Sequence, residues 1–380
     1  MKAAGDRSGQ VATRGRVGAG GAPDDCGLMP GEHRPLVGCT LGDPAGIGPD
    51  VLLRAACEDT GADLLLLGDP DHLRSRLRAL AATEGLLAAP LSDLSTVTDP
   101  TQARKHQRNG QRGPWVLPCT TVVPGLQLGT PRNEDARAAI ESIQAGAELA
   151  LSGGIDALVT APVNKHQIAA LETRFMGHTE YLAAHAGVRH PIMLFAGPTP
   201  HIALLTTHLP LATALTLVRH ELVATMLKRL HRQWSQRFGR APVIGVAAFN
   251  PHAGEGGRLG TEESRELSPA IQAAREAGVD AQGPYPADSI FLRRGLDVVL
   301  ALYHDQGTIM AKRAPWPTIN LTLGLPYVRT SPDHGTAYDL AGTGRADHAP
   351  MVAAIRLAAE LCAVRGGGVP PSAAPTGVSG

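Results

Sequence analysis

The sequence predicts an α/β protein with two α/β/α domains built on doubly wound, mostly parallel sheets. Short apolar runs of strand length alternate along the chain with longer segments of helical periodicity, which is the pattern of parallel strands joined by helices. Aromatic residues make up only 3% of the chain, whereas its 44 glycines and 30 prolines suit many short loops. With 380 residues the chain exceeds one ordinary compact unit, so two domains are expected.

The strands are predicted from runs of four to eight aliphatic or β-branched residues bounded by polar or glycine-rich sequence. Several of these runs carry almost no polar residue, as in DLLLLG at 63–68, and this is typical of strands buried on both faces. The predicted strands are residues 36–40, 63–68, 156–162, 191–195, 202–205, 243–248, 298–303, 318–323 and 327–331.

The helices are predicted from apolar periodicity and end signals. Gly153-Gly154 marks the end of one helix, Thr179 is expected to cap another, and residues 90–114 are expected to form irregular loops. Residues 211–234 are expected to form a single amphipathic helix with basic residues near its carboxyl end. The remaining predicted helices begin near residues 50, 69, 134, 262, 286 and 347.

Composition excludes several classes of partner. The chain holds 35 basic and 35 acidic residues, so there is no electrostatic footprint for nucleic acid or for an acidic membrane surface. No apolar run approaches the ~20 residues of a membrane span, and no apolar signal segment follows the basic residues near the start. The five cysteines are scattered and form no CxxC pair, which favours reduced thiols in the cytoplasm.

Three histidines follow predicted strands. His208 comes shortly after residues 202–205, His252 after 243–248, and His304 directly after 298–303, where Gly307 is expected to let the chain turn. Ligands of open α/β sheets lie beyond the carboxyl ends of strands, and three imidazoles suit a divalent ion with one open position. Each histidine alone is more often a hydrogen-bonded surface or core residue, so the hypothesis of a metal site depends on the three together.

Cationic and polar residues near other strand ends form a second candidate set. Lysines and arginines in loops are most often merely solvated, but as a group these residues could clamp a phosphate or a carboxylate. The set consists of Lys165, His178, Thr179, Lys312, Asn320 and Arg329. Asp288 is expected to be a helix N-cap. The loop at 42–49 could bring backbone N–H groups against a ligand, although a merely tight turn is an equal alternative.

These residues lie in motifs that resemble one family. The motifs are GDPAGIGP, TAPVNK, GHTE, TTHLPL, NPHAGEGG, PADSIF, YHDQG and LTLGLPYVRTSPDHGTAYDLAG. In this order, from about residue 36 to 365, they resemble the 4-hydroxythreonine-4-phosphate dehydrogenase family of vitamin B6 biosynthesis. Two departures from the family pattern stand out. The segment at 313–319, just before Asn320, lacks the expected glycines, and Asp50 stands where the family usually has glutamate.

The resemblance implies roles for individual residues and an isocitrate/isopropylmalate dehydrogenase-like fold. It implies one divalent ion per subunit (zinc, magnesium, cobalt or manganese) on His208, His252 and His304. It implies a homodimer whose active sites lie at the interface. The implied substrate-binding residues are His178, Thr179, Lys312, Asn320, Arg329 and Asp288. The implied cofactor-binding residues, for NAD or NADP, are Gly42, Asp43, Gly46, His334, Gly335, Thr336 and Ala337.

The resemblance also implies a domain division. Residues 1–34 are expected to be a disordered extension and 366–380 a disordered tail, because they are rich in small and polar residues without periodicity. Residues 35–150 together with 330–365 are expected to form a first domain on the cofactor side. Residues 151–329 are expected to form a second domain that holds the metal and the substrate.

The implied reaction is the oxidation of 4-phosphooxy-L-threonine at C3, followed by decarboxylation to 3-amino-2-oxopropyl phosphate. One alternative is a dehydrogenase of the same family that acts on a four-carbon sugar-acid phosphate or a cyclic dihydrodiol. A second alternative is an acyl transferase related to phosphate acetyltransferase, in which the three histidines would be coincidental. A metal-binding protein without activity is the least favoured interpretation, since it would have no use for a phosphate clamp.

Overall fold

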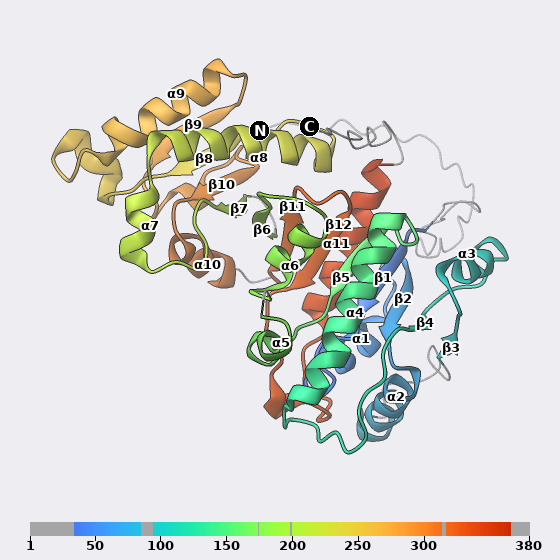
Figure 1. The fold of residues 1–380 in the computed structure, drawn as a ribbon. Helices are drawn as coiled ribbons and strands as arrows, with labels where there is room; N and C mark the ends of the chain where they lie inside the picture. The colour runs from blue at the N-terminus through green and yellow to red at the C-terminus, as the bar shows by residue number, and fades with distance from the viewer. Residues whose placement is uncertain (1–33, 85–93, 174, 198–199, 314–316, 366–380) are drawn as a thin grey trace, which may run out of the picture. The chain divides into compact units, whose positions relative to one another are not determined.

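The computed structural model describes residues 34–365, with gaps at 85–93, 174, 198–199 and 314–316 (Figure 1). The two segments predicted to be disordered therefore lie outside the described residues, apart from Arg34. No helix among the described residues is long and apolar enough to cross a membrane.

The strands of the described residues form one twelve-stranded sheet in the order β3-β4-β2-β1-β5-β12-β11-β6-β7-β10-β8-β9. In chain order they are β1 Leu36–Thr40, β2 Asp63–Gly68, β3 Ser95–Thr96, β4 Trp115–Pro118, β5 Ala157–Thr160, β6 Ile192–Ala196, β7 His201–Leu204, β8 Ile244–Ala247, β9 Ala281–Tyr285, β10 Val298–Ala301, β11 Ile319–Leu323 and β12 Val328–Pro332. The strands of both predicted domains thus share one sheet, and the domain division stays a prediction.

The helices surround this sheet. They are α1 Gly48–Ala55, α2 Pro70–Glu84, α3 Pro100–Arg108, α4 Asn133–Ser152, α5 Lys165–Leu171, α6 His178–His185, α7 Leu211–Leu217, α8 His220–Phe238, α9 Ser268–Glu276, α10 His304–Arg313 and α11 Ala349–Arg365. Short 3-10 segments cover Pro251–Gly257, Ile290–Leu292 and Tyr338–Leu340, and Glu263–Leu267 is a π-helical turn.

Neighbouring strands are parallel except for the pairs β12–β11, β11–β6 and β6–β7. The strands β7, β10, β8 and β9 therefore run opposite to the strands β3, β4, β2, β1, β5 and β12. Because β7, β10 and β8 are parallel neighbours, their carboxyl ends meet at one edge of the sheet. These are the three strands that precede His208, His304 and His252, which confirms the arrangement on which the histidine hypothesis depends.

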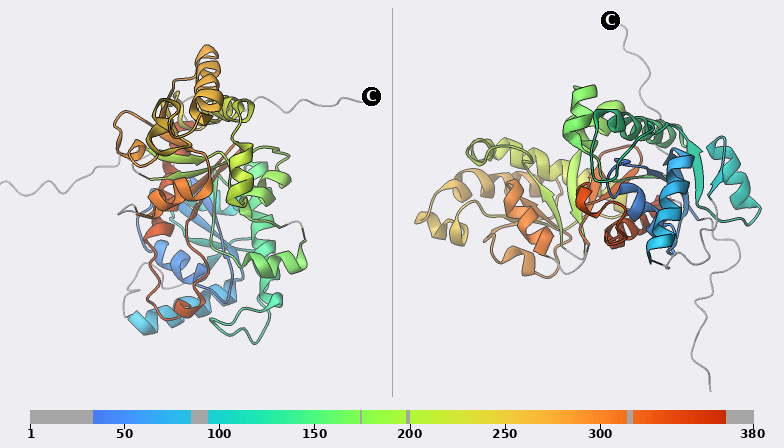
Figure 2. Two further views of the ribbon diagram at one scale, coloured as in Figure 1. Left: turned by 90° about the vertical axis from the view of Figure 1, so that its left-hand side faces the viewer. Right: turned by 90° about the horizontal axis from the view of Figure 1, so that it is seen from below.

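Alternate residues of the strands pack toward opposite faces of the sheet. Leu64 and Leu66 of β2 join a core with α1 and α11, whereas Leu65 and Leu67 join a core with α4. Helices α4 and α11 accordingly lie on opposite sides of the strands, as the right-hand view of Figure 2 shows. The prediction of a mostly parallel sheet with helices on both faces is confirmed.

The predicted helix at 211–234 is wrong, because α7 ends at Leu217 and α8 begins at His220. Val218 leaves the helical region with ψ at 83° and buries its side chain, and Arg219 is fully extended. The apolar face continues across this break, so periodicity alone could not reveal it.

The irregular loop predicted at 90–114 is also wrong over part of its length, since it contains β3 and α3. The side chain of Asp99 accepts a hydrogen bond from the backbone N–H of Gln102, and Pro100 occupies the first turn of α3. Asp-Pro is a helix-start signal that the polar composition of the segment obscured. The edge strands β3 and β9 and the strand β4 next to β3 were not predicted, and β9 contains both a glycine and a proline.

Two local predictions near the site are wrong as well. Helix α6 begins at His178 with Gly177 at the N-cap, so Thr179 lies inside the first turn and makes no cap. Gly307 does not turn the chain, because it lies within α10. A Cβ atom there would come within 2.7 Å of Leu204 and 2.9 Å of Ile202, so glycine is needed for α10 to pack closely on β7.

Candidate active site

A cavity of about 320 Å³ gathers residues from segments that are distant in the sequence. It lies where the end of β5, the start of α6, strand β12 and the loop after β7 come together. Several residues predicted to bind substrate or cofactor line it: His178, Thr179, His208, Lys312, Asn320, Arg329, His334 and Gly335.

Arg329 is the most unusual residue of this cavity. It lies in β12 and is only 3% exposed, and its guanidinium donates to the hydroxyls of Thr322 (3.1 Å) and Thr160 (2.6 Å). Among the described residues no carboxylate lies within ion-pair distance of it, and its Nε atom has no hydrogen-bond partner. Burial lowers the pKa of Arg329 to about 10, so it remains a cation at neutral pH. A buried cation without a carboxylate partner provides a place for an anionic ligand.

Other buried polar atoms around this cavity also lack partners among the described residues. They are Nε2 of His178, Oδ1 of Asn320 and Nε2 of His334. Buried polar groups are nearly always hydrogen-bonded in native proteins, so a set of unpartnered atoms around one cavity indicates a bound ligand or water.

His178 is a neutral imidazole in this structure. Burial, together with the positive charges of Arg329 and Lys165, holds the pKa of His178 well below its usual range. Thr179 follows it in α6 and is 7% exposed, which places its hydroxyl in the wall of the cavity. A neutral imidazole and a hydroxyl are donors that can bind an anion without adding charge.

Asp333 is a cavity residue that the sequence interpretation missed. Its Oδ1 atom accepts a hydrogen bond from Asn320 Nδ2 at 3.1 Å, and its Oδ2 atom lies 3.4 Å from Lys312 Nζ. Asp333 therefore joins two residues that were predicted to bind substrate. Its position directly after β12, in the motif SPDHG, was the signal that could have revealed it.

Two of the three predicted metal ligands lie next to each other. The ring centroids of His208 and His304 are 5.6 Å apart, a spacing that suits two imidazoles on one ion. Nδ1 of His304 hydrogen-bonds the Asp305 carboxylate at 2.7 Å, which leaves Nε2 for a ligand, as in many metal sites. Burial, assisted by Lys165, lowers the pKa of His208, so its ring is neutral as ligation requires.

The third predicted ligand does not join this pair. His252 is exposed in the loop after β8, and within the described residues no group of three or more His, Cys, Asp or Glu side chains could hold a metal ion. Asp288, predicted to bind substrate or to cap a helix, is exposed and does not line the cavity. It is not the N-cap, because Ser289 precedes the 3-10 helix Ile290–Leu292.

The residues predicted to bind the cofactor form two loops that contact each other. The backbone N–H of Ile47 donates to Thr336 O at 2.9 Å, and a Cβ on Gly46 would meet that same oxygen at 2.9 Å. Tyr338 donates its hydroxyl hydrogen to Asp43 at 2.6 Å, and burial raises the pKa of both side chains. The predicted loops from the two ends of the chain are therefore adjacent, and their role in cofactor binding stays a prediction.

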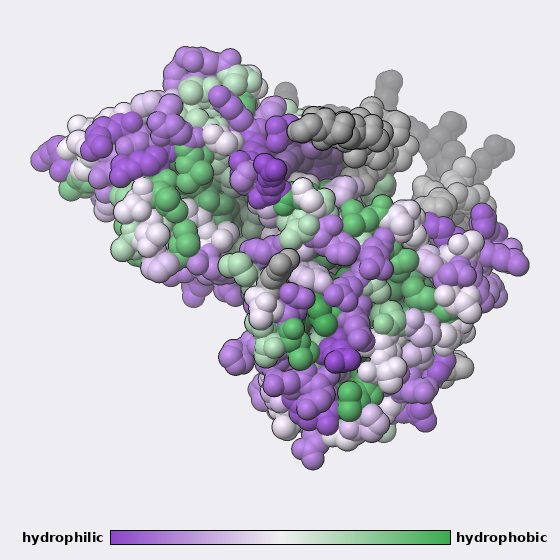
Figure 3. Space-filling model, in the orientation of Figure 1, coloured by the Kyte–Doolittle hydropathy of each residue, from purple (hydrophilic) through white to green (hydrophobic). Residues whose placement is uncertain are grey.

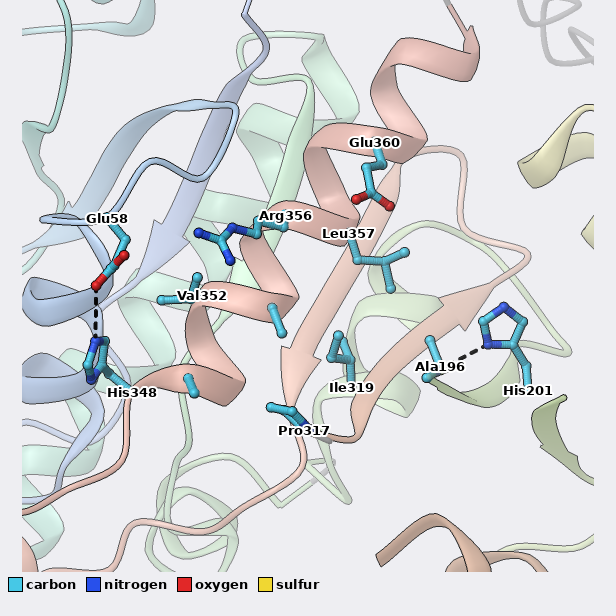
Figure 4. Close-up of a pocket in the computed structure, with 13 residues that line it drawn as sticks. Glu58, Ala196, His201, Pro317, Ile319, His348, Val352, Arg356, Leu357 and Glu360 are labelled. Atoms are coloured by element: carbon cyan, nitrogen blue, oxygen red, sulfur yellow. Dashed lines mark hydrogen bonds and ion pairs between the residues drawn. The ribbon is translucent and has the colours of Figure 1, made fainter. Parts of the chain in front are cut away.

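A second, larger cavity of about 550 Å³ lies between α11 and strands β6 and β11 (Figure 4). Its wall combines apolar residues of α11 with an ion pair between His348 and Glu58 at 3.6 Å. None of the predicted site residues lines it, so the smaller cavity is the candidate active site.

The fold and the cavity define an α/β protein whose small polar cavity holds a buried arginine next to a pair of histidines. A family model makes this class specific. The chain belongs to the family of pyridoxal phosphate biosynthetic protein PdxA, whose model matches residues 60–358.

The chain is similar to several proteins that are named as dehydrogenases. The 4-hydroxythreonine-4-phosphate dehydrogenase of Methylococcus capsulatus is 41% identical and aligns over 86% of this chain and 96% of its own. A crystal structure of the 4-hydroxythreonine-4-phosphate dehydrogenase of Klebsiella pneumoniae has 32% identity and a TM-score of 0.75, and covers 87% of this chain and 98% of its own. A crystal structure of a terephthalate 1,2-cis-dihydrodiol dehydrogenase of Burkholderia xenovorans LB400 has 27% identity and a TM-score of 0.59. It covers 86% of this chain and 98% of its own. These relatives are oxidoreductases, which favours the dehydrogenase over the acyl transferase.

Proposed function

We propose that this chain is an NAD(P)-dependent and divalent-metal-dependent 4-hydroxythreonine-4-phosphate dehydrogenase of pyridoxal phosphate biosynthesis. Family membership and the names of the relatives support this activity. The observation that carries it in the structure is Arg329, a buried cation without a carboxylate partner among the described residues, in a cavity with further unpartnered polar atoms. A substrate that bears a phosphate and a carboxylate supplies the missing negative charge.

The chain's own residues position this substrate. The phosphate or carboxylate of the substrate is held by Arg329, Lys312, His178 and Thr179, so that C3 faces the nicotinamide. Holding the two reacting groups in this orientation lowers the activation free energy. The bound nicotinamide cofactor would accept a hydride from C3 as the hydroxyl proton is lost. The resulting β-keto acid would then lose carbon dioxide.

The histidines His208 and His304 would hold the divalent ion. Their spacing and their neutral or carboxylate-oriented rings fit two ligands of one ion, whereas His252 would have to come closer to complete the set. A divalent ion bound there would lower the pKa of the C3 hydroxyl and stabilise the charge that develops during decarboxylation. Zinc, cobalt, magnesium and manganese all remain candidates, with imidazoles favouring the softer ions.

The two contacting loops would hold the nicotinamide cofactor. The loop with Gly42, Asp43 and Gly46 meets the loop from His334 to Ala337, and His334 also lines the substrate cavity. A cofactor seated on these loops would thus lie next to the substrate, as hydride transfer demands.

The protein is proposed to act as a homodimer with its active sites at the interface. The loop after β7 and helices α7 and α10 expose large apolar side chains, which include Leu211 at 54% and Ile309 at 61%. Figure 3 shows apolar residues gathered over the part of the face where α7 lies. Exposed apolar surface next to a site is typical of a protein–protein contact, and a partner would also give the exposed Asp288 and His252 a place in a site.

A cytoplasmic location is proposed from the cysteines. Cys39, Cys57 and Cys119 are free thiols. Burial raises the pKa of Cys39 and brings that of Cys119 to about 12, so these thiols are inert. Free thiols of this kind suit a reducing compartment.

The test of the proposed function is the absorbance of reduced nicotinamide with 4-phosphooxy-L-threonine, NAD or NADP and a divalent ion. The proposal predicts a signal that a chelator abolishes and that added metal restores. A signal only with a four-carbon sugar-acid phosphate or a cyclic dihydrodiol would replace the substrate and keep the mechanism. Metal-loaded, folded protein that is inactive with all of these hydroxy acids would refute the dehydrogenase assignment.

A further inference from the structure

The side chains of Thr206 and Gln306 link the ends of β7, β10 and β8, the three strands that precede His208, His304 and His252. The hydroxyl of Thr206, after β7, donates to Leu302 O at 2.9 Å, and Leu302 follows β10. The side-chain oxygen of Gln306 accepts from Leu302 N at 2.7 Å, and its nitrogen donates to Ala248 O at 2.9 Å. Ala248 follows β8, so Gln306 spans the ends of the strands that precede His304 and His252. The labels β7, β10 and β8 in Figure 1 mark these neighbouring strands.

Glu263 holds the segment between β8 and His252. One carboxylate oxygen accepts from the backbone N–H groups of Phe249 (2.9 Å) and Asn250 (2.6 Å), and the other accepts from Asn250 Nδ2 at 3.0 Å. Glu263 is 6% exposed, and no described cation lies within ion-pair distance of it. A buried carboxylate that accepts three hydrogen bonds fixes its partners strongly, because charge-assisted bonds are about twice as strong as neutral ones.

The segment that Glu263 anchors has an unusual backbone. All five residues from 252 to 256 have positive φ, and His252, Ala253 and Glu255 do so at 53°, 54° and 43°. Such a conformation is strained for each residue that is not glycine, and it persists only where surrounding contacts impose it. Gly254 lies directly over the carboxylate, since a Cβ there would come within 2.6 Å of Glu263.

We propose that Glu263 is a positioning residue that fixes the left-handed loop and thereby sets the direction of His252. Gln306 has the same role between the strand ends, and neither side chain lines the candidate active site. The inference rests on the proposed function, because His252 has a purpose only as a ligand of the divalent ion. It predicts that the metal affinity of the protein depends on a carboxylate eleven residues away from the ligand that it positions.

The test measures cobalt(II) binding to the full-length chain by visible absorbance and by competition with a chelator. Glu263→Ala should weaken binding about 10- to 100-fold, the loss seen when groups that orient metal ligands are removed. Glu263→Gln should fall between this variant and the wild type, because the amide oxygen still accepts from the backbone of Phe249 and Asn250. The visible spectrum of bound cobalt should change in both variants, which a merely structural effect would not produce.

Glu266 provides the matched control. It lies in the same π-helical turn and accepts from the backbone N–H of His220 at 2.9 Å and from Arg219 at 3.1 Å, away from the histidine loop. Glu266→Gln should lower thermal stability as Glu263→Gln does and leave the cobalt affinity and spectrum unchanged. Wild-type affinity and spectrum in both Glu263 variants would overturn the inference alone. A wild-type chain that binds no cobalt would overturn the metal proposal and the inference together.

Discussion

The cavity around Arg329 and the three histidine-bearing strand ends differ in how completely one chain assembles them. The cavity is formed by buried residues of β12 and by adjoining segments whose side chains already contact one another. His208 and His252 are exposed in loops, and His304 is the first residue of α10. His208 and His304 are adjacent, whereas His252 lies apart. The comparison indicates that one chain alone forms the proposed anion site, whereas the proposed metal site would need its ion or a second subunit to be complete.

The largest effect is expected from Arg329→Met. Loss of the buried cation should lower kcat/KM by the equivalent of about 2–5 kcal/mol, because the anionic group of the substrate then enters the cavity unpaired. The free energy of unfolding of the ligand-free protein should be unchanged or higher, since the variant removes a buried charge without a carboxylate partner. Steady-state kinetics measure the change in kcat/KM, and denaturant titration measures the change in the free energy of unfolding.

The exposed Arg345 provides the control, and Arg345→Met should change neither quantity. A variant at Arg329 that unfolds more easily and keeps its kcat/KM would show that this arginine is structural.

His208→Ala and His304→Ala test the other region. Each variant should bind cobalt(II) more than about a hundredfold more weakly, which exceeds the effect typical of groups outside the ligand set. The affinity of the metal-free cavity for the anionic substrate should remain. The exposed His190 provides the control variant His190→Ala. If His208→Ala and His304→Ala bound cobalt(II) as tightly as the control His190→Ala, neither His208 nor His304 would be a metal ligand.

Gly307→Ala tests how closely α10, the helix that begins at His304, must pack against β7. The added Cβ would come within 2.7 Å of Leu204, so the variant should lose about 1–3 kcal/mol of unfolding free energy. Gly335→Ala is the matched control, because a Cβ at Gly335 meets no atom within 4 Å. Thermal melts of both variants decide the point, and equal melting temperatures would contradict the close packing of α10.

The smallest effect concerns pH. The pKa of His178 is lower in the folded chain than in the unfolded one, so the stability that it contributes is complete above about pH 6.5 and is lost as the pH falls. In the ligand-free protein His178→Gln should reduce the slope of stability against pH by up to about 1.4 kcal/mol per pH unit below 6.5. An anion in the cavity raises the pKa of His178, so added inorganic phosphate should reduce the wild-type slope in the same way.

His201 serves as the control for this prediction because it lies outside the cavity, with its pKa lowered to about 4 by burial. His201→Phe should reduce the slope whether or not phosphate is present. A phosphate effect that is equal in the wild type and in His178→Gln would place the anion elsewhere.

Much of the fold could be predicted from the sequence, because the decisive signals are local. The buried runs that became β2, β8 and β10 and the glycine that ends α4 at Gly153 were all readable. The placement of His208, His252 and His304 directly or shortly after predicted strands was also readable. The break at Val218 could not be predicted, because the apolar face continues across it.

The sequence could predict which residues belong to the candidate site but not how they are buried and paired. Arg329 and Lys312 could be named from the motifs, but burial of a cation between two threonine hydroxyls depends on tertiary packing that a strand pattern does not encode. The contact of Asp333 with Lys312 has the same origin. The position of His252 depends on the left-handed loop, and its anchor at Glu263 comes from an element that carries no site motif.

One binding measurement tests the central claim most directly. Metal-free wild-type protein and Arg329→Met are titrated calorimetrically with 4-phosphooxy-L-threonine in the presence of a chelator. A preformed anion site predicts that the wild type binds the substrate without metal and that the variant loses this binding. Equal binding by both proteins, or binding by the wild type only after metal is restored, would contradict the account.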